Sequence, residues 1–269
     1  MDYDPVKDSL IRIFERSVTG QRLFFWLLHR VFLRSWYVRR SLRTLLAGRP
    51  NARVLDAGTG FGQYTDWILR RYPGVEIVAV DIKQDYLDRL RGYLDAAGLS
   101  DRAAVRFGDL VRLSEEGPFD VVLSVDVMEH IEEDVEVFRH FARVLAPGGH
   151  VIINTPSDQG GSDVGADGGE SFIGEHVRDG YGVDEISQKL RSAGLTAERI
   201  EYGYGPVGSV GWRLLVQVPM KMLGLSRALV VLLPLYYLPA FPVGMLLNAI
   251  DLLRENPRGT GLTVVASRQ

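Results

Sequence analysis

Two groups of residues have the types and the spacing that chemistry on a ligand would need. The first is the stretch LDAGTGFGQY (55–64), in which Asp56 precedes three closely spaced glycines. Glycines let a backbone turn tightly and approach a ligand closely. A carboxylate beside such a loop would repel a pyrophosphate and attract a ligand that carries a positive charge and an amino group. The stretch therefore favours a cationic ligand over a dinucleotide.

The second group lies further along the chain, in SVDVMEHI (124–131) and GEHVRDGY (174–181). A reaction that removes a proton from its acceptor needs a base within reach. His130 is the first candidate, with acids close by in the sequence. The alternative is that this histidine only holds its loop. The candidate catalytic residues are Asp126, Glu129, His130, His176 and Arg178.

Short apolar runs that alternate with amphipathic stretches must position these residues. Such a pattern predicts a parallel sheet with helices on both faces, and ligands bind such sheets beyond the carboxyl ends of the strands. We expect helices over 62–72, 84–98, 132–149 and 183–195. The third of these should stop at Pro147. We expect strands over 52–58, 75–81, 103–109, 119–126, 150–156, 196–204 and 259–267.

The residues at the expected strand ends agree with this placement. Asp81 ends the second strand, 23 residues after Gly58, where a carboxylate would accept two hydrogen bonds from ribose hydroxyls. Dinucleotide-binding loops have a third glycine where this chain has Gln63. A nicotinamide-dependent oxidoreductase therefore stays a weaker alternative.

Four motifs together resemble a class I S-adenosylmethionine-dependent methyltransferase, similar to the ubiquinone and menaquinone biosynthesis type. They are D-x-G-x-G after the first strand, the acid that ends the second, GDL (108–110), and LAPGGHVIINTP (145–156). The resemblance covers about residues 50–200. It implies an α/β fold with a doubly wound, mostly parallel seven-stranded sheet whose last strand is antiparallel.

The resemblance also implies how S-adenosylmethionine would be held. The glycine loop would lie under the methionine part, with Asp56 near its ammonium group. Asp81 would bind the ribose, Ile82 would lie against the adenine face, and Asp109 with the Leu110 amide would meet the adenine edge. The predicted cofactor-binding residues are Asp56, Gly58, Thr59, Gly60, Gly62, Tyr64, Asp81, Ile82, Asp109, Leu110 and Ser124.

Two further features near the acceptor end leave alternatives. The spacing of Asp126, Glu129 and His130, with His176 as a fourth ligand, is similar to the E-x-x-E-H metal sites of ubiquinone O-methyltransferases and small-RNA end methyltransferases. Asp126, the first acid of the set, is one methylene shorter than the glutamate of those sites. We predict no metal. The glycine-rich stretch 157–174 is either a lid over the acceptor or a surface loop.

The N-terminal segment, residues 1–49, is basic and aromatic. Residues 11–48 carry eight arginines against one glutamate, a net +7, so the rest of the chain sums to −10 because the total is −3. A helix of this kind suits an anionic membrane surface, and the alternative is that its aromatic residues pack on the domain. Nucleic acid binding is not expected, because phosphates would repel the acidic remainder.

The segment 205–258 is an apolar insertion between the last two strands. Residues 228–250 contain no charge, and the only charges between Tyr202 and Ile250 are positive. Both flanking strands belong to one sheet, so a single membrane crossing is excluded. Three prolines, Pro234, Pro239 and Pro242, should break the run into short helices at a membrane surface. The alternative is an extra helical layer or a dimer contact.

The methyltransferase domain is expected over 50–204 and 259–269, with a hydrophobic, membrane-resident acceptor such as a quinone, isoprenoid or lipid-like phenol. One alternative is a soluble acceptor, with the insertion as a dimer interface. Another is a non-catalytic protein that binds membranes or partners. The chain has no cysteine, which favours a reducing compartment. We expect a cytoplasmic protein that associates peripherally with the inner face of a membrane, with the oligomeric state open.

Overall fold

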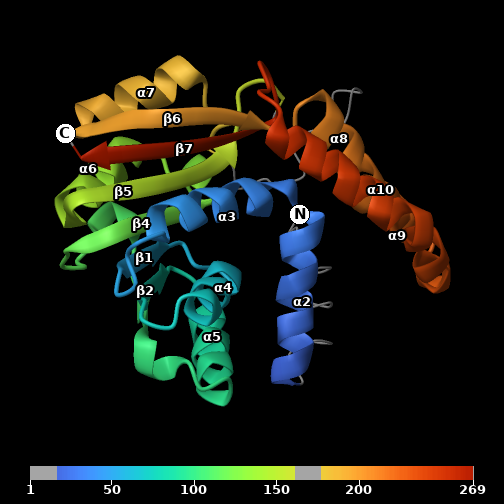
Figure 1. The fold of residues 1–269 in the computed structure, drawn as a ribbon, viewed down its shortest axis with the longest axis horizontal. Coiled ribbons are helices and arrows are strands. Elements are labelled where there is room, and N and C mark those ends of the chain that lie inside the picture. Colours follow the sequence, from blue (N-terminus) through green and yellow to red (C-terminus); the bar gives the residue numbers. More distant parts are fainter. Residues whose placement is uncertain (1–16, 161–176, 269) are drawn as a thin grey trace.

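A computed structural model describes residues 17–160 and 177–268. Its centre is a seven-stranded sheet of order β3-β2-β1-β4-β5-β7-β6, in which only β7 is antiparallel to its neighbours (Figure 1). This confirms the predicted fold class. The strands are β1 (Arg53–Ala57), β2 (Glu76–Asp81), β3 (Ala103–Phe107), β4 (Phe119–Val125), β5 (Leu145–Pro156), β6 (Leu195–Gly203) and β7 (Gly261–Arg268).

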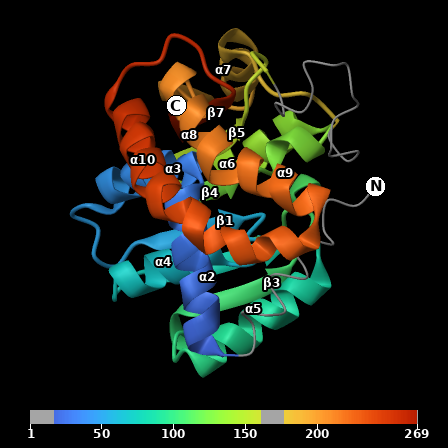
Figure 2. The ribbon, with the colours of Figure 1, turned by 90° about the vertical axis from the view of Figure 1, so that its right-hand side faces the viewer.

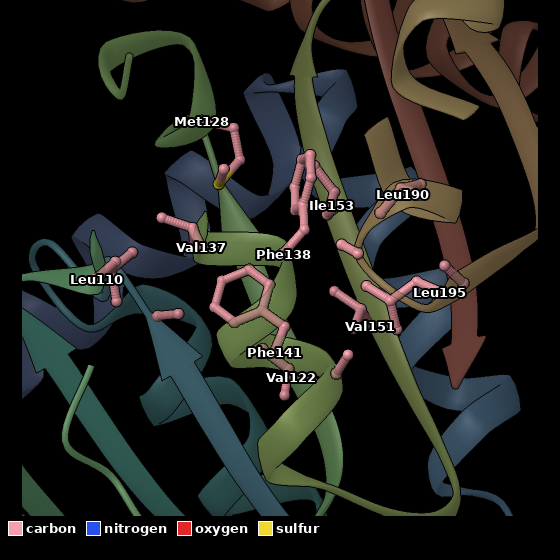
Figure 3. Packing of buried hydrophobic residues seen from close by; sticks show 14 of the residues in the cluster. Leu110, Val122, Met128, Val137, Phe138, Phe141, Val151, Ile153, Leu190 and Leu195 are labelled. Atoms are coloured by element: carbon pink, nitrogen blue, oxygen red, sulfur yellow. The ribbon is translucent and has the colours of Figure 1, made fainter. Parts of the chain in front are cut away.

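Helices cover both faces of the sheet, as the alternating sequence pattern requires. One face packs against α3 (Leu33–Leu46), α4 (Gln63–Arg71) and α5 (Gln84–Ala96). The other packs against α6 (Asp134–Val144) and α7 (Val183–Ser192). Figure 3 shows the second core, where the rings of Phe138 and Phe141 fill the space between α6 and the strands. Short 3-10 helices occur at Ser100–Arg102, Leu110–Arg112 and Met128–His130.

The N-terminal segment forms two helices, α2 (Val18–Val31) and α3, that meet at Phe32. The Ser17 side chain accepts a hydrogen bond from the Gly20 amide and so caps the start of α2. Phe32 has an extended backbone, which ends α2 and turns the chain into α3. α3 buries Val38 and Leu42 against the sheet, and α2 buries Phe25.

The insertion forms an arm of helices, which we define as Pro206–Leu253. Its first part runs through α8 (Pro206–Trp212), a π-helical segment (Arg213–Gln217) and α9 (Val218–Leu225). A 3-10 helix (Arg227–Leu232) then leads into α10 (Leu233–Leu253), which packs back on α8. The arm projects from the sheet edge at which β6 ends (Figure 1). Gly203, the last residue of β6, pairs with Gly261, the first of β7.

The prediction that prolines break this run is wrong, because α10 is one helix of 21 residues. Pro234 lies in its first turn, where no backbone N–H donor is needed. Pro239 and Pro242 each remove one N–H, and the carbonyls that lose a partner belong to Leu235 and Leu238, whose side chains are exposed. The helix survives because packing on α8 holds it.

The chain after α6 also differs from the prediction. α6 ends at Val144, and β5 begins directly at Leu145, so Pro147 lies inside a strand instead of ending a helix. Leu145 pairs with Phe119, and the register then shifts before Val121 pairs with His150. Proline is tolerated where the strand ladder is irregular, because no ladder bond is lost there.

Candidate functional site

The parallel strands end at one edge of the sheet, and the predicted site residues gather there. β1, β2, β4 and β5 are parallel neighbours, and their carboxyl ends carry the loop after β1, Asp81, Asp126 and the last residues of β5. In Figure 2 this edge faces the viewer, with α2, α9 and α10 in front of it. The topology thus brings the glycine loop and residues 124–131 together at the edge where such sheets bind ligands.

The loop between β1 and α4 is shaped by three glycines in the left-handed backbone region. Gly58 and Gly62 have φ values of 82° and 79°, and a Cβ on either would lie within 2.3 Å of a side-chain carbon of Val127 or Leu90. Gly60 has a φ of 54°, yet a Cβ there would meet no atom within 4 Å. The loop is therefore packed at both ends and open at its centre.

Asp56 lies beneath this loop. Its side chain is 3% exposed, and its Oδ2 accepts hydrogen bonds from the hydroxyls of Thr59 at 2.8 Å and Thr65 at 2.7 Å. Burial raises the pKa of the Asp56 carboxyl to about 6, although the two hydroxyls oppose that change. These contacts give Asp56 and Thr59 a role in holding the loop. Direct contact of Asp56 with a ligand ammonium stays a prediction.

Asp81 joins the loop to the end of β2. Its carboxylate accepts from the Gly60 amide at 2.8 Å and from the Lys83 amide at 2.9 Å. The next side chain, Ile82, is 60% exposed although it is apolar. An acid beside an exposed apolar side chain suits a ribose and the face of a base, so these residues fit the adenosine part of S-adenosylmethionine.

The remaining predicted cofactor residues lie at different depths. Asp109 is exposed and accepts from the Val111 amide at 2.9 Å, whereas Leu110 is buried. The Ser124 hydroxyl is buried and has no hydrogen-bond partner in the described part of the chain, which suits a polar ligand atom. Tyr64 is buried, and its hydroxyl lies 3.0 Å from that of Ser35 in α3.

The acceptor end holds two neighbouring carboxyl groups. Asp126 follows β4 with a φ of 54°, an uncommon conformation for a residue other than glycine. Glu129 is 2% exposed, and its Oε2 accepts from the Thr155 hydroxyl at 3.2 Å. Burial, and then the charge of Asp126, raise the pKa of Glu129 to about 8. His130, the first candidate base, is exposed.

Two residues that the sequence motifs do not contain also reach this edge. The Arg34 Nε atom of α3 lies 2.8 Å from the Asp126 Oδ2 atom, which ties the N-terminal helices to the end of β4. The His29 Nε2 atom of α2 lies 3.1 Å from the carbonyl oxygen of Gln63, the first residue of α4. The net charge of +7 in residues 11–48 does not show which arginine pairs with an acid of the sheet.

Arg178 contacts α6 and the backbone that follows His130. Its guanidinium pairs with Asp134 and donates to the Tyr181 hydroxyl at 2.8 Å and to the Ile131 carbonyl at 2.8 Å. Hydrogen bonds from Lys189 and Tyr181, with the charge of Arg178, lower the pKa of Asp134 although burial opposes them. A catalytic role for Arg178 stays untested.

Two other predictions concern residues outside the described ranges. His176 and most of the expected lid, 157–174, fall in 161–176, which the structure does not describe. Within residues 17–160 and 177–268, no three histidine, aspartate or glutamate side chains are placed to hold a metal ion. The metal alternative, which includes His176, is therefore not tested.

Comparison with known proteins agrees with this site. Residues 55–151 match the model of the methyltransferase domain family. A ubiquinone biosynthesis O-methyltransferase from Xanthomonas euvesicatoria is 27% identical over 167 residues, which is 60% of this chain and 68% of the relative. The chain spans only 6% of another relative, a polyketide synthase from Burkholderia thailandensis, over 117 residues that are 30% identical.

Solved structures show the same fold. A putative sarcosine dimethylglycine methyltransferase from Galdieria sulphuraria has a TM-score of 0.59 at 20% identity, covering 86% of this chain and 82% of that one. An O-methyltransferase from a Brevibacillus brevis polyketide synthase, in complex with S-adenosyl-L-homocysteine, has a TM-score of 0.56 at 17% identity over 84% and 71%. The chain belongs to the class I S-adenosylmethionine-dependent methyltransferases. Within that class it is a distant homologue of the ubiquinone biosynthesis O-methyltransferases.

Proposed function

We propose that this chain transfers a methyl group from S-adenosylmethionine to a hydrophobic small-molecule acceptor that resides in a membrane. The observation that carries the proposal is the position of the arm. β6 is parallel to β5, so the arm leaves the sheet at the ligand-binding edge and returns there into β7. An apolar element at that edge suits an apolar acceptor better than a polar one.

The described residues at this edge have different proposed roles. When bound, S-adenosylmethionine would supply an electrophilic methyl group, whose carbon bonds to the acceptor atom as its bond to sulfur breaks and S-adenosylhomocysteine leaves. Gly60 provides an open backbone surface, and Asp81 provides a carboxylate for hydroxyl groups. Asp126 and Glu129 lie at the end of β4, where a carboxylate can take the proton that an acceptor hydroxyl loses.

The direct test follows a labelled methyl group. The full chain is incubated with S-adenosylmethionine labelled in the methyl group, together with either a membrane lipid extract or a water-soluble extract of the source cell. Mass spectrometry then locates the label. We expect a labelled product in the lipid extract. Label only in water-soluble products would contradict the hydrophobic acceptor, and label in neither extract would contradict the activity.

A matched pair of variants makes this test specific. Asp81→Ala removes the carboxylate that meets the glycine loop, and labelling should fall to background. Asp88→Ala removes an exposed carboxylate of α5 that accepts hydrogen bonds from the Gln84 and Arg91 side chains, and labelling should persist. Equal labelling by both variants would show that the product does not arise at this site.

A further inference from the structure

We infer that the arm and α2 together form a surface that binds an anionic lipid bilayer and enters only its outer part. The inference deepens the proposed function by naming the partner of the site. Its test measures lipid binding without methyl transfer, so the two can fail separately. Four observations carry it, namely burial, charge, the contact between α2 and α10, and topology.

The arm exposes more apolar surface than a folded domain usually leaves in water. Ala228–Leu253 is the one helix in the described ranges that is long and apolar enough to cross a membrane, and only 11% of its most apolar window is buried. A core helix would be mostly buried. The exposed fractions reach 83% for Leu225, 76% for Val231, 67% for Leu235 and 71% for Leu238. Apolar patches of this kind mark interaction sites.

The charges around this apolar surface have one sign. From Tyr202 to Ile250 the sequence has three basic residues and no acidic residue, and α2 and α3 contain no acidic residue either. The first acid of the arm, Asp251, is fully buried and accepts from the Tyr37 hydroxyl and the Gly208 amide. Arg213 and Lys221 are exposed. Anionic headgroups attract basic residues beside an apolar surface.

α2 extends the surface beyond the arm. Trp26 of α2 is 45% exposed, and its ring stacks on that of Phe241 in α10 with centroids 6.4 Å apart. The Arg30 guanidinium lies over the Trp26 ring at 5.0 Å. Trp26, Arg22 and Arg30 are all exposed and follow one another at four-residue spacing on α2. Tryptophan beside arginine is typical of the region where headgroups meet acyl chains.

Topology sets the depth of insertion. Gly203 pairs with Gly261, so both ends of the arm are fixed on one sheet edge and must lie on the same side of a bilayer. The first half of the arm contains the exposed Arg213 and Lys221, which favour headgroups over the hydrocarbon centre. The arm therefore lies in the interface of one leaflet and does not cross it.

A second copy of this chain fits the surface less well than a bilayer does. The arm projects away from the body of the molecule instead of forming a flat patch (Figure 1). Two arms packed together would also bring their basic residues close without an exposed acid of the arm to compensate them. Lipid headgroups supply the missing negative charge.

The test is flotation of the full chain with lipid vesicles. Vesicles of phosphatidylcholine alone are compared with vesicles that also contain phosphatidylglycerol, at low and at high salt. We expect the chain to float with the anionic vesicles and to bind them more weakly at high salt, because salt screens the headgroup charge. A chain that stays with the lipid-free fraction at every composition would overturn the inference.

Matched variants separate the surface from general effects of charge. Leu225→Glu with Val231→Glu should abolish flotation, whereas Ala96→Glu with Gln188→Glu, at exposed positions of α5 and α7, should not. Lys221→Gln should weaken binding to anionic vesicles about fivefold, which corresponds to ~1 kcal/mol per basic residue near the surface. Binding of S-adenosylhomocysteine, measured by calorimetry, should be unchanged and shows that the variants fold.

Light scattering measures the oligomeric state and so tests whether a second copy of the chain binds this surface. A dimer that forms without lipid and that Leu225→Glu with Val231→Glu dissociates would assign the surface to self-association and overturn the inference. Equal flotation of the arm variant and its control would overturn it as well. Flotation as expected without any methyl transfer would contradict the proposed function alone.

Discussion

His29 is buried between α2 and the first turn of α4, beside the rings of Tyr64 and Trp67. Its Nε2 faces the Gln63 carbonyl, so that nitrogen must carry the proton and donate. Burial, together with the charge of Arg39, lowers the pKa of His29 to about 4. His29 is the residue through which α2 contacts the end of the glycine loop. The protonation state of His29 therefore affects how α2 packs against that loop.

The first prediction concerns the pH dependence of stability. His29 is neutral in the folded protein down to about pH 4, whereas in the unfolded chain it takes up a proton below about pH 6.5. The contribution of His29 to the free energy of unfolding is therefore complete above pH 6.5 and is lost as the pH falls through 4. The loss amounts to about 3 kcal/mol, since one pKa unit is ~1.4 kcal/mol.

The measurement is urea unfolding at several values between pH 4 and pH 7 for the wild type and for His29→Phe. The variant should lose less unfolding free energy on acidification than the wild type, because the carboxyl groups common to both cancel in the comparison. Parallel pH dependences would show that His29 does not stay neutral in the folded state.

The second prediction compares two glycines of the loop. Gly58→Ala should lower the free energy of unfolding by about 3 kcal/mol, because alanine is strained at its φ and its Cβ would overlap Val127. Gly60→Ala meets no protein atom and should cost about 1 kcal/mol for its φ alone. Urea unfolding measures both values.

The same pair tests where a ligand approaches. Gly60→Ala should weaken S-adenosylhomocysteine binding at least about tenfold in calorimetry, or ~1.4 kcal/mol, because the new methyl group occupies the open side of the loop. Unchanged affinity in that variant would show that the ligand does not approach the backbone at Gly60.

Among the elements, α3 links the arm to the sheet. It packs on β5, β6 and β7 and also contacts α10. The buried Tyr37 hydroxyl donates to Asp251 Oδ1 of α10 at 2.8 Å and accepts from Asn256 at 3.1 Å. Three residues earlier in the same helix, Arg34 pairs with Asp126. One helix thus contacts both the base of the arm and the acceptor end of the site.

The third prediction measures the anchor of the arm. Tyr37→Phe leaves the buried Asp251 carboxyl without its side-chain donor and should lower the free energy of unfolding by about 2 kcal/mol. Tyr202→Phe removes a hydroxyl that bonds to Gln159 at the exposed surface, and about 0.5 kcal/mol is expected. Similar losses in thermal unfolding would show that the buried contact does not hold the arm.

Local signals were sufficient to predict most elements but not the arm or the full site. The glycine loop follows from the spacing of Gly58 and Gly60, and the strand ends follow from short apolar runs and, for the second strand, from Asp81. Each of these signals lies within or beside the element that it predicts. The continuity of α10 depends on packing against α8, which outweighs the local effect of Pro239. The pairing of Arg34 with Asp126 joins residues far apart in the chain, and no local pattern encodes it.

At the scale of the whole molecule, apolar and basic residues gather at one end. α2, α3 and the arm supply them, whereas the charges outside residues 11–48 and 206–253 sum to −12. α2 and the arm, which carry exposed apolar side chains, lie in front of the carboxyl edge of the sheet (Figure 2). A negatively charged surface would therefore be attracted to α2, α3 and the arm and repelled by the acidic remainder of the chain.

The fourth prediction concerns cofactor binding by the whole protein. S-adenosylhomocysteine at one hundred times its dissociation constant should stabilise the fold by about 2.7 kcal/mol and raise Tm by about 5–10 °C. Asp81→Ala should abolish the rise and Asp88→Ala should keep it, since only Asp81 contacts the glycine loop. The measurement is differential scanning calorimetry, and a rise that survives in Asp81→Ala would place the nucleoside elsewhere.

The pairing of Gly203 with Gly261 has a consequence for how such an enzyme can be altered. The chain leaves β6 and enters β7 at residues that face each other, so 57 residues, 204–260, begin and end at one place on the sheet. A two-residue hairpin turn would span the same gap, since adjacent antiparallel strands need no more. If the arm docks the protein as we propose, an exchange at this junction would give the same sheet a different acceptor or address.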